Sequence, residues 1–129
     1  MALIKNTTGW QEVKVTKELT AARYGSGLVE VYATPAMIAL MEKTCQESVQ
    51  DQLEHGQLTV GTLVNVRHLK ATPIGMMVEC TSELTEIEGR KLVFKVTAKD
   101  EKGIIGEGIH ERFIVNEKDF MKKLEGANE

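Results

Sequence analysis

The spacing of the apolar residues changes once along the chain, at Gly56. Before it, apolar residues from Met37 to Leu53 recur at steps of three and four, while charged and amide side chains occupy the other faces, as in an amphipathic helix. Thr34 and Pro35 precede this run; a Thr side chain can cap the first turn, and Pro has no N–H to leave unpaired there. The pattern predicts a helix from Thr34 to about Gly56, which suits a C-terminal cap.

After Gly56 the period of the pattern changes to two, which is typical of strands with one buried face. In the first of these stretches we expect Val64 on the core face and Gly61 on the opposite face. Turn residues separate the later stretches. The predicted strands are Leu58–Val66, Met76–Leu84, Leu92–Ala98 and Ile104–Val115.

The order of these elements predicts an α+β fold. Four successive strands follow one long helix through short turns, so we expect an antiparallel meander curled around the helix, which is the hotdog arrangement. The length of 129 residues is near the commonest domain size, so we expect one domain, 1–129. The N-terminal part is expected to form a strand around Val13–Thr20, a loop at Tyr24–Gly27 and a short strand at Leu28–Tyr32; the C-terminal part is expected to form a helix over Glu117–Leu124.

Composition and charge exclude several classes of function. With 42% hydrophobic and 27% charged residues, the chain can bury a core without disulfides or metal. A net charge of −3 provides no attraction for nucleic acid or an anionic membrane. No secretory or membrane-spanning apolar run is seen, so we expect a cytoplasmic protein. Cys45 and Cys80 lack CxxC or His neighbours at ligand spacing; we therefore expect two buried free thiols, no metal and no cofactor.

Three residues are candidates for chemistry, and each has a plainer interpretation. Thr34 can be a helix cap, Glu42 a solvated carboxylate beside an apolar stripe, and His68 an exposed residue at a strand end. Together they would supply a hydroxyl, an acid or base and an imidazole, which suits hydrolytic acyl transfer. The helix N-terminus offers N–H groups to an oxyanion, and Gly61 would let a substrate approach the strand closely or would mark a bulge.

Several segments resemble one known family, the fluoroacetyl-CoA-specific thioesterases of the hotdog thioesterase superfamily. The resemblance covers about residues 30 to 115, keeping order and spacing. It rests on Tyr32-Ala33-Thr34, Leu40-Met41-Glu42, Leu58 to Thr62, Val66, His68, Ala71-Thr72-Pro73, Gly75, Glu88-Gly89-Arg90 and Gly106-x-Gly108-x-His110-Glu111-Arg112.

This resemblance implies hydrolysis of a small acyl-CoA thioester to the free acid and CoA. It implies that Thr34, Glu42 and His68 are catalytic and that Gly61 and Arg112 contact the substrate. An ion pair with a strand carboxylate is the plainer role for Arg112. Fluoroacetyl-selective members carry a longer segment with Pro and Phe over the acyl pocket. The stretch 23–31 here has neither residue, so the resemblance implies thioester hydrolysis without fluorine selectivity.

The spacing of two candidates poses a geometric problem. Thr34 and Glu42 are separated by about 12 Å of rise on a straight helix, so one regular helix cannot bring them into contact. Either the chain folds back before the helix or a second subunit completes the site. Because the sheet leaves an open edge, we expect a homodimer. The alternatives to a thioesterase are a non-catalytic module that binds acyl-CoA and an acyl-CoA hydratase or dehydratase.

Overall fold

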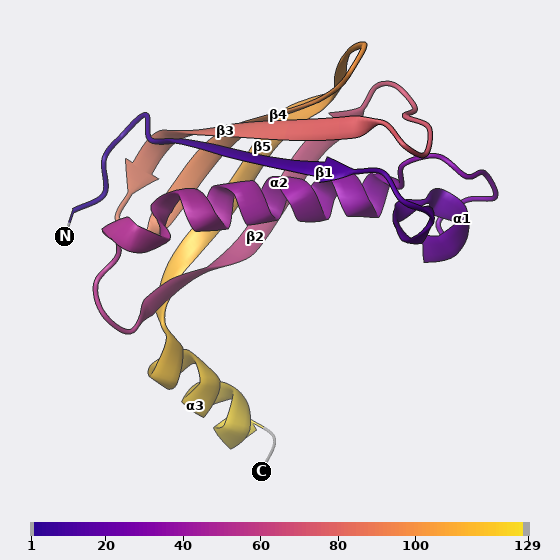
Figure 1. Cartoon of the computed structure of the whole chain (residues 1–129). Coiled ribbons are helices and arrows are strands. Elements are labelled where there is room, and N and C mark those ends of the chain that lie inside the picture. The colour runs from indigo at the N-terminus through magenta and orange to yellow at the C-terminus, as the bar shows by residue number, and fades with distance from the viewer. Residues whose placement is uncertain (1, 128–129) are drawn as a thin grey trace.

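The computed structural model describes residues 2–127, which form one antiparallel sheet and one long helix (Figure 1). The strands are β1 (Thr8–Lys14), β2 (Gln57–His68), β3 (Met77–Glu88), β4 (Lys91–Asp100) and β5 (Gly103–Asn116). The helices are α1 (Ala21–Tyr24), α2 (Thr34–Val49) and α3 (Glu117–Ala127), with short 3-10 helices η1 (Lys17–Leu19) and η2 (Gln50–Gln52). The α+β hotdog prediction is confirmed, because α2 lies along one face of the sheet.

The order of strands in the sheet differs from the predicted meander. It is β1-β3-β4-β5-β2, so only β3, β4 and β5 are neighbours in chain order. The connection 69–76 carries the chain from β2, at one edge, to β3 on the other side of β4 and β5. Alternating polarity predicts that a strand exists but does not specify its neighbour, and β2 pairs with β5 over its whole length.

The core lies between α2 and the sheet. Met37, Met41 and Cys45 of α2 are fully buried, as are Phe94 and Val96 of β4. Both cysteines are buried and free, as predicted. Burial raises the pKa of Cys45 to about 12, so this thiol stays protonated inside the core.

The N-terminal part departs most from the predicted elements. The early strand is β1, which ends at Lys14, and the segment after it forms η1 and α1 instead of continuing the strand to Thr20. The Thr20 side chain accepts a hydrogen bond from the Arg23 N–H, which starts α1. The expected strand at Leu28–Tyr32 is absent from the described chain apart from two isolated bridges, Thr20–Tyr32 and Val31–Pro73.

A β-bulge in β2 reverses the predicted facing of Gly61. The register against β5 shifts between Gly61 and Leu63, so Thr62 is an extra residue. Gly61 opposes Arg112 and Val64 opposes His110, which places both residues of β2 on the face toward α2. The prediction that Gly61 and Val64 lie on opposite faces was therefore wrong, because an inserted residue inverts the alternation.

The C-terminal helix α3 begins at Glu117, as predicted, and ends at Ala127, beyond the predicted end at Leu124. It extends away from the sheet (Figure 1). None of the helices formed by residues 2–127 has both the length and the hydrophobicity that a membrane span requires.

Candidate active site

Thr34 and His68 meet at one end of the sheet. Thr34 is the first residue of α2; the cap residue is Ala33, and no side chain caps the helix, so the predicted capping role was wrong. The Thr34 Oγ1 instead lies 2.7 Å from Nδ1 of His68, the last residue of β2. A contact between residues 34 positions apart replaced the local one, because the end of β2 lies beside the start of α2.

The surroundings of His68 favour its neutral form. The imidazole is half-buried and meets the Tyr32 ring edge to face, with centroids 6.5 Å apart. Burial lowers the pKa of His68, against a smaller raising effect from the backbone at Lys70. The Nε2 atom is buried and has no hydrogen-bond partner among the described residues. A neutral imidazole with an acceptor Nδ1 is suited to take a proton from the Thr34 hydroxyl.

A pocket of about 330 Å³ opens beside this pair. Thr34, His68 and Lys70 line it together with Ala21, Ser26 and Val31, which come from the segment before α2. Leu28, in the same segment, is 98% exposed and points to solvent. Tyr32, Leu69 and Ala71 complete the lining, so residues 23–31 themselves contribute only Ser26 and Val31 to it.

Glu42, Gly61 and Arg112 form a second cluster further along α2. A Cβ added at Gly61 would lie 2.8 Å from Glu42 Oε2 and 3.3 Å from Arg112 Nη1. No side chain fits at Gly61 unless the carboxylate moves, so glycine is required by this close approach. The backbone conformation is not the reason, because Gly61 does not have a positive φ.

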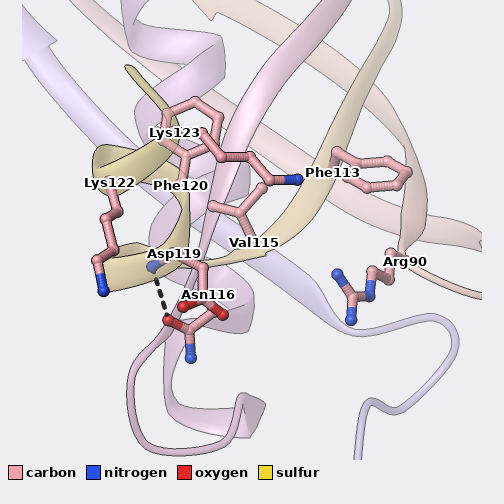
Figure 2. A pocket seen from close by; sticks show the side chains of 8 residues that line it. All are labelled: Arg90, Phe113, Val115, Asn116, Asp119, Phe120, Lys122 and Lys123. Atoms are coloured by element: carbon pink, nitrogen blue, oxygen red, sulfur yellow. Dashed lines mark hydrogen bonds between the residues drawn. The ribbon is translucent and has the colours of Figure 1, made fainter. Parts of the chain in front are cut away.

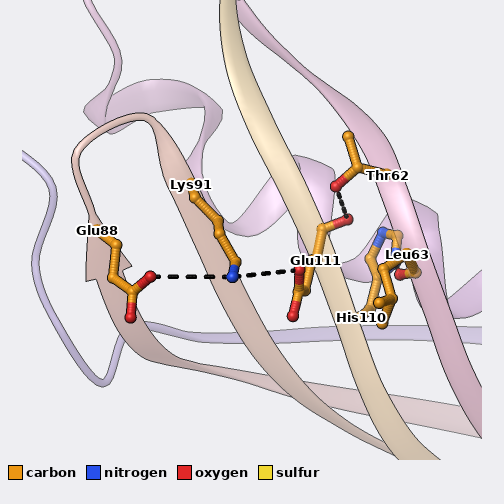
Figure 3. Close-up of polar contacts among 6 residues, drawn as sticks. All are labelled: Thr62, Leu63, Glu88, Lys91, His110 and Glu111. Carbon is orange, nitrogen blue, oxygen red and sulfur yellow. Dashed lines mark hydrogen bonds and ion pairs between the residues drawn. The ribbon is translucent and has the colours of Figure 1, made fainter.

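Arg112 is held rigidly by hydrogen bonds in a buried position. It is 7% exposed, and its Nε donates to Thr59 Oγ1 at 2.7 Å while Nη2 donates to the Thr59 carbonyl at 2.9 Å. Its Nη1 lies 3.1 Å from Nε2 of His110. Arg112 forms no ion pair with a strand carboxylate in the described chain, and the adjacent carboxylate, Glu111, pairs with Lys91 at 3.6 Å (Figure 3).

His110 is a functional candidate that the sequence analysis did not single out. Its Nδ1 lies 2.8 Å from the Leu63 carbonyl oxygen, which can only accept, so Nδ1 donates and Nε2 accepts from Arg112. Burial lowers the pKa of His110, and the Arg112 cation lowers it further, while the Leu63 carbonyl raises it. The spacing His-x-Arg could have identified His110 from the sequence, because in an alternating strand it places both side chains on one face of the sheet.

The five predicted site residues therefore form two groups within one chain. Thr34 and His68 make one, and Glu42, Gly61 and Arg112 make the other. Thr34 and Glu42 lie on one regular helix, and no hydrogen bond joins Glu42 to Thr34 or His68 in the described part of the chain. Within residues 2–127, no three His, Cys, Asp or Glu side chains converge as metal ligands would.

Comparison with known proteins identifies the family. The fluoroacetyl-CoA thioesterase of Streptantibioticus cattleyicolor is 41% identical over 95 residues, covering 74% of this chain and 68% of that protein. The structure of the fluoroacetyl-CoA thioesterase FlK superposes with a TM-score of 0.91 at 32% identity, covering 98% of both chains. A thioesterase superfamily member from Thermus thermophilus superposes at 0.89 with 28% identity, covering 97% of this chain and 93% of that one. Residues 15–118 match the profile of the family described as fluoroacetyl-CoA-specific thioesterase, and the chain belongs to this family.

Proposed function

We propose that this chain hydrolyses a small acyl-CoA thioester as a homodimer with two composite active sites. Thr34 and His68 of one copy would act with Glu42, Gly61 and Arg112 of the partner subunit. One observation carries this proposal: the two groups flank the same edge strand, with Gly61 near its middle and His68 at its end. An edge strand can pair with its own copy, so β2 offers a way to bring the two groups together.

The exposed edge of β2 suits pairing with a second copy. The strand is 12 residues long and its residues 61–65 are exposed, with Leu63 and Val64 at 41% and 42%. A long, unpaired and partly apolar edge is unfavourable in an isolated protein, because its backbone N–H and C=O groups form a template for another strand. Two copies pairing antiparallel about a twofold axis would satisfy both edges at once.

The bulge defines the pairing register that would complete the site. With the twofold axis at Asn65, Leu63 faces Arg67 of the partner subunit on the outer side of the sheet. Thr62 is the extra residue of the bulge. The residue before it, Gly61, therefore comes opposite His68 of the partner subunit, on the side of the sheet toward α2. Glu42 and Arg112, which contact the space at Gly61, then lie beside the Thr34–His68 pair of the other copy.

In this composite site the proton transfers follow from the groups present. His68 Nδ1 takes a proton from the attacking oxygen, which belongs to Thr34 or to a water molecule held by it. The oxygen attacks the thioester carbon, and the imidazolium formed is stabilised by the carboxylate of Glu42 of the partner subunit. Backbone N–H groups near Thr34 or Gly61 hold the developing oxyanion beside the Arg112 cation. The C–S bond then breaks, and His68 returns the proton to the CoA thiolate. If water attacked, the free acid is released in this step. If Thr34 attacked, water then cleaves the acyl ester on Thr34, giving one proton through His68 back to the Thr34 oxygen and releasing the free acid.

We place the enzyme in the cytoplasm, since two free thiols are compatible with a reducing compartment.

A module that binds acyl-CoA without hydrolysing it is the alternative from another class. It would have no use for a neutral histidine within hydrogen-bond distance of a hydroxyl. The first test is a panel of short, branched and aromatic acyl-CoAs, followed by release of free thiol. Binding of these ligands without turnover would establish the module and exclude the enzyme.

Subunit complementation tests the composite site directly. The variants His68→Ala and Glu42→Ala, each inactive, are mixed under conditions that exchange subunits. A heterodimer has one site with both substitutions and one site with neither, so random exchange restores about a quarter of wild-type activity. Mixing His68→Ala with Thr34→Ala is the matched control, because both residues belong to the same group and no site is repaired. No recovery in the first mixture, with exchange verified, would refute a shared site.

The register of the proposed dimer can be tested by cross-linking. The two copies of residue 65 would face each other across the twofold axis, within reach of a disulfide. The variant Asn65→Cys should therefore form a covalent dimer on oxidation. Glu12→Cys, on the edge strand β1 at the other side of the sheet, should remain a monomer on denaturing gels. The double variant Leu63→Cys/Arg67→Cys provides a second test of the same register. If neither it nor Asn65→Cys forms cross-links, pairing through β2 in this register is excluded.

A further inference from the structure

A second pocket, distant from Thr34 and His68, has the chemistry of a nucleotide-binding site. It measures about 560 Å³, within the usual range of about 300–1,000 Å³ for ligand pockets. It lies between the turn after β3, the end of β5 and the helix α3 (Figure 2). Its walls combine three cationic side chains, Arg90, Lys122 and Lys123, with two aromatic rings, Phe113 and Phe120.

The aromatic residues of this pocket are unusual in the chain. Of the three phenylalanines, Phe94 is fully buried in the core and the other two both line this pocket. Phe113 and Phe120 remain 40% and 37% exposed. Exposed rings in a concave site provide stacking surfaces for a planar heterocycle such as a purine.

The cations of the pocket are not neutralised by the protein. Lys91, the neighbour of Arg90, is held by Glu88 at 3.8 Å and Glu111 at 3.6 Å. Arg90, Lys122 and Lys123 form no ion pair with any residue of the described chain. One carboxylate, Asp119, also lines the pocket, which leaves an excess of positive charge in a protein with a net charge of −3. Phosphate groups are the anions that such an arrangement suits.

We infer that this pocket binds the nucleotide end of the acyl-CoA substrate, an adenosine carrying a 3′-phosphate and a 5′-diphosphate. The inference rests on the proposed function for the link to catalysis. A purine would stack on the phenylalanine rings, and the phosphates would meet Arg90 and Lys123, which approach the pocket from the β3–β4 turn and from α3 (Figure 2).

The position of the pocket relative to the proposed active site agrees with the shape of CoA. Phe113 pairs with Val60, and its neighbour Arg112 pairs with Gly61, so the pocket and the Glu42 cluster lie on opposite faces of the same two strands. The proposed dimer pairs β2 from Gly61 onward, which leaves the edge free at 57–60. The flexible pantetheine arm can pass around β2 there and connect the thioester to the nucleotide.

Three other pockets fit a nucleotide less well. The pocket beside His68 has Lys70 as its lysine or arginine and contains the proposed catalytic pair. A pocket of about 640 Å³ is lined by His55, offers Lys118 beside Glu117, and has no Phe, Tyr or Trp ring. A pocket beside Trp10 has Lys95 together with Glu83. Several cations and two stacking rings coincide in the Phe113 pocket.

The test measures nucleotide binding apart from catalysis. Calorimetric titration with adenosine 3′,5′-bisphosphate is carried out on the wild type, on Arg90→Gln/Lys123→Gln and on the control Lys5→Gln/Lys14→Gln, which removes the same charge elsewhere. We expect the pocket variant to bind at least about tenfold more weakly, since each contact to a charged phosphate contributes that much or more. Equal affinity in all three proteins, or no binding by the wild type, would overturn the inference.

Kinetics then link the pocket to the substrate. For acetyl-CoA the pocket variant should show a KM raised about tenfold with kcat unchanged, whereas acetyl-pantetheine, which lacks the nucleotide, should be hydrolysed equally well by variant and wild type. A KM that rises for both substrates would contradict the assignment. If no acyl-CoA is hydrolysed while the bisphosphate still binds in a charge-dependent manner, the proposed hydrolysis fails and the nucleotide site stands.

Discussion

Replacing Gly61 by alanine adds one methyl group at the point where Glu42 and Arg112 meet. The new carbon would lie 2.8 Å from Glu42 Oε2 and 3.2 Å from His110 Cε1. Non-bonded carbon and oxygen atoms remain further apart than this, so the carboxylate has to move by about half an ångström or more. Displacements of about 1 Å in a reacting group cost on the order of a hundredfold in rate. We therefore expect kcat to fall by about ten- to a hundredfold.

The stability of this variant should change little. Gly61 has no positive φ, so alanine adopts its backbone conformation without strain. The reduced entropy of the unfolded chain stabilises the variant by about 0.5–1 kcal/mol, which offsets part of the steric cost. Kinetics with acetyl-CoA and denaturant unfolding of the same preparation would separate loss of geometry from loss of fold.

A double-mutant cycle with Glu42→Ala tests whether the carboxylate transmits the effect. If the methyl group acts by displacing Glu42, adding Gly61→Ala to Glu42→Ala should cause little further loss of kcat. Fully additive losses would show that Gly61 acts independently of Glu42. Wild-type turnover in Gly61→Ala alone would refute the assignment of this cluster to the active site.

Three further outcomes are expected. His68→Ala and Glu42→Ala should each lower kcat by at least about a hundredfold with nearly unchanged melting temperatures, and a variant that keeps full turnover would remove its residue from the site. Burial holds the pKa of His110 below its ordinary 6.5, so at first only the unfolded chain takes up this proton as the pH falls. The unfolding free energy, measured between about pH 8 and 5, should therefore decrease below pH 6.5, and it should decrease less in His110→Asn. The ratio of kcat/KM for fluoroacetyl-CoA over acetyl-CoA should stay below roughly 200, because the segment 23–31 supplies little apolar enclosure; a ratio of many thousands would show that other residues provide selectivity.

Local periodicity predicted the elements that carry the Thr34–His68 pair. The helix begins at Thr34 as predicted, and the strand predicted to Val66 ends at His68. The hydrogen bond between them was beyond prediction, because a threonine before Pro35 satisfies the rules for a helix cap equally well. A non-local contact replaced the local one, and only the arrangement of β2 against α2 reveals it.

The residues of the second cluster were singled out by family resemblance more than by pattern. The sequence around Thr62 has apolar and polar residues on both sides, so its alternation gives no sign that one residue is extra. The bulge moved Gly61 to the face toward α2, beside Glu42. Acyl-CoA thioester hydrolysis, predicted from the resemblance, is confirmed by family membership.

The two halves of the proposed site differ in charge, and this difference bears on why they are separate in one chain. The Thr34–His68 half is neutral, since burial lowers the pKa of His68, whereas the other half holds the Glu42 carboxylate and the Arg112 cation. A carboxylate near an imidazole favours its protonated form. Pairing of two copies would therefore raise the pKa of His68 by bringing Glu42 of the partner subunit close, and would stabilise the imidazolium that forms when His68 takes its proton. Assembly and catalysis would then depend on the same electrostatic contact, which a single chain cannot make because α2 is straight and regular between Thr34 and Glu42.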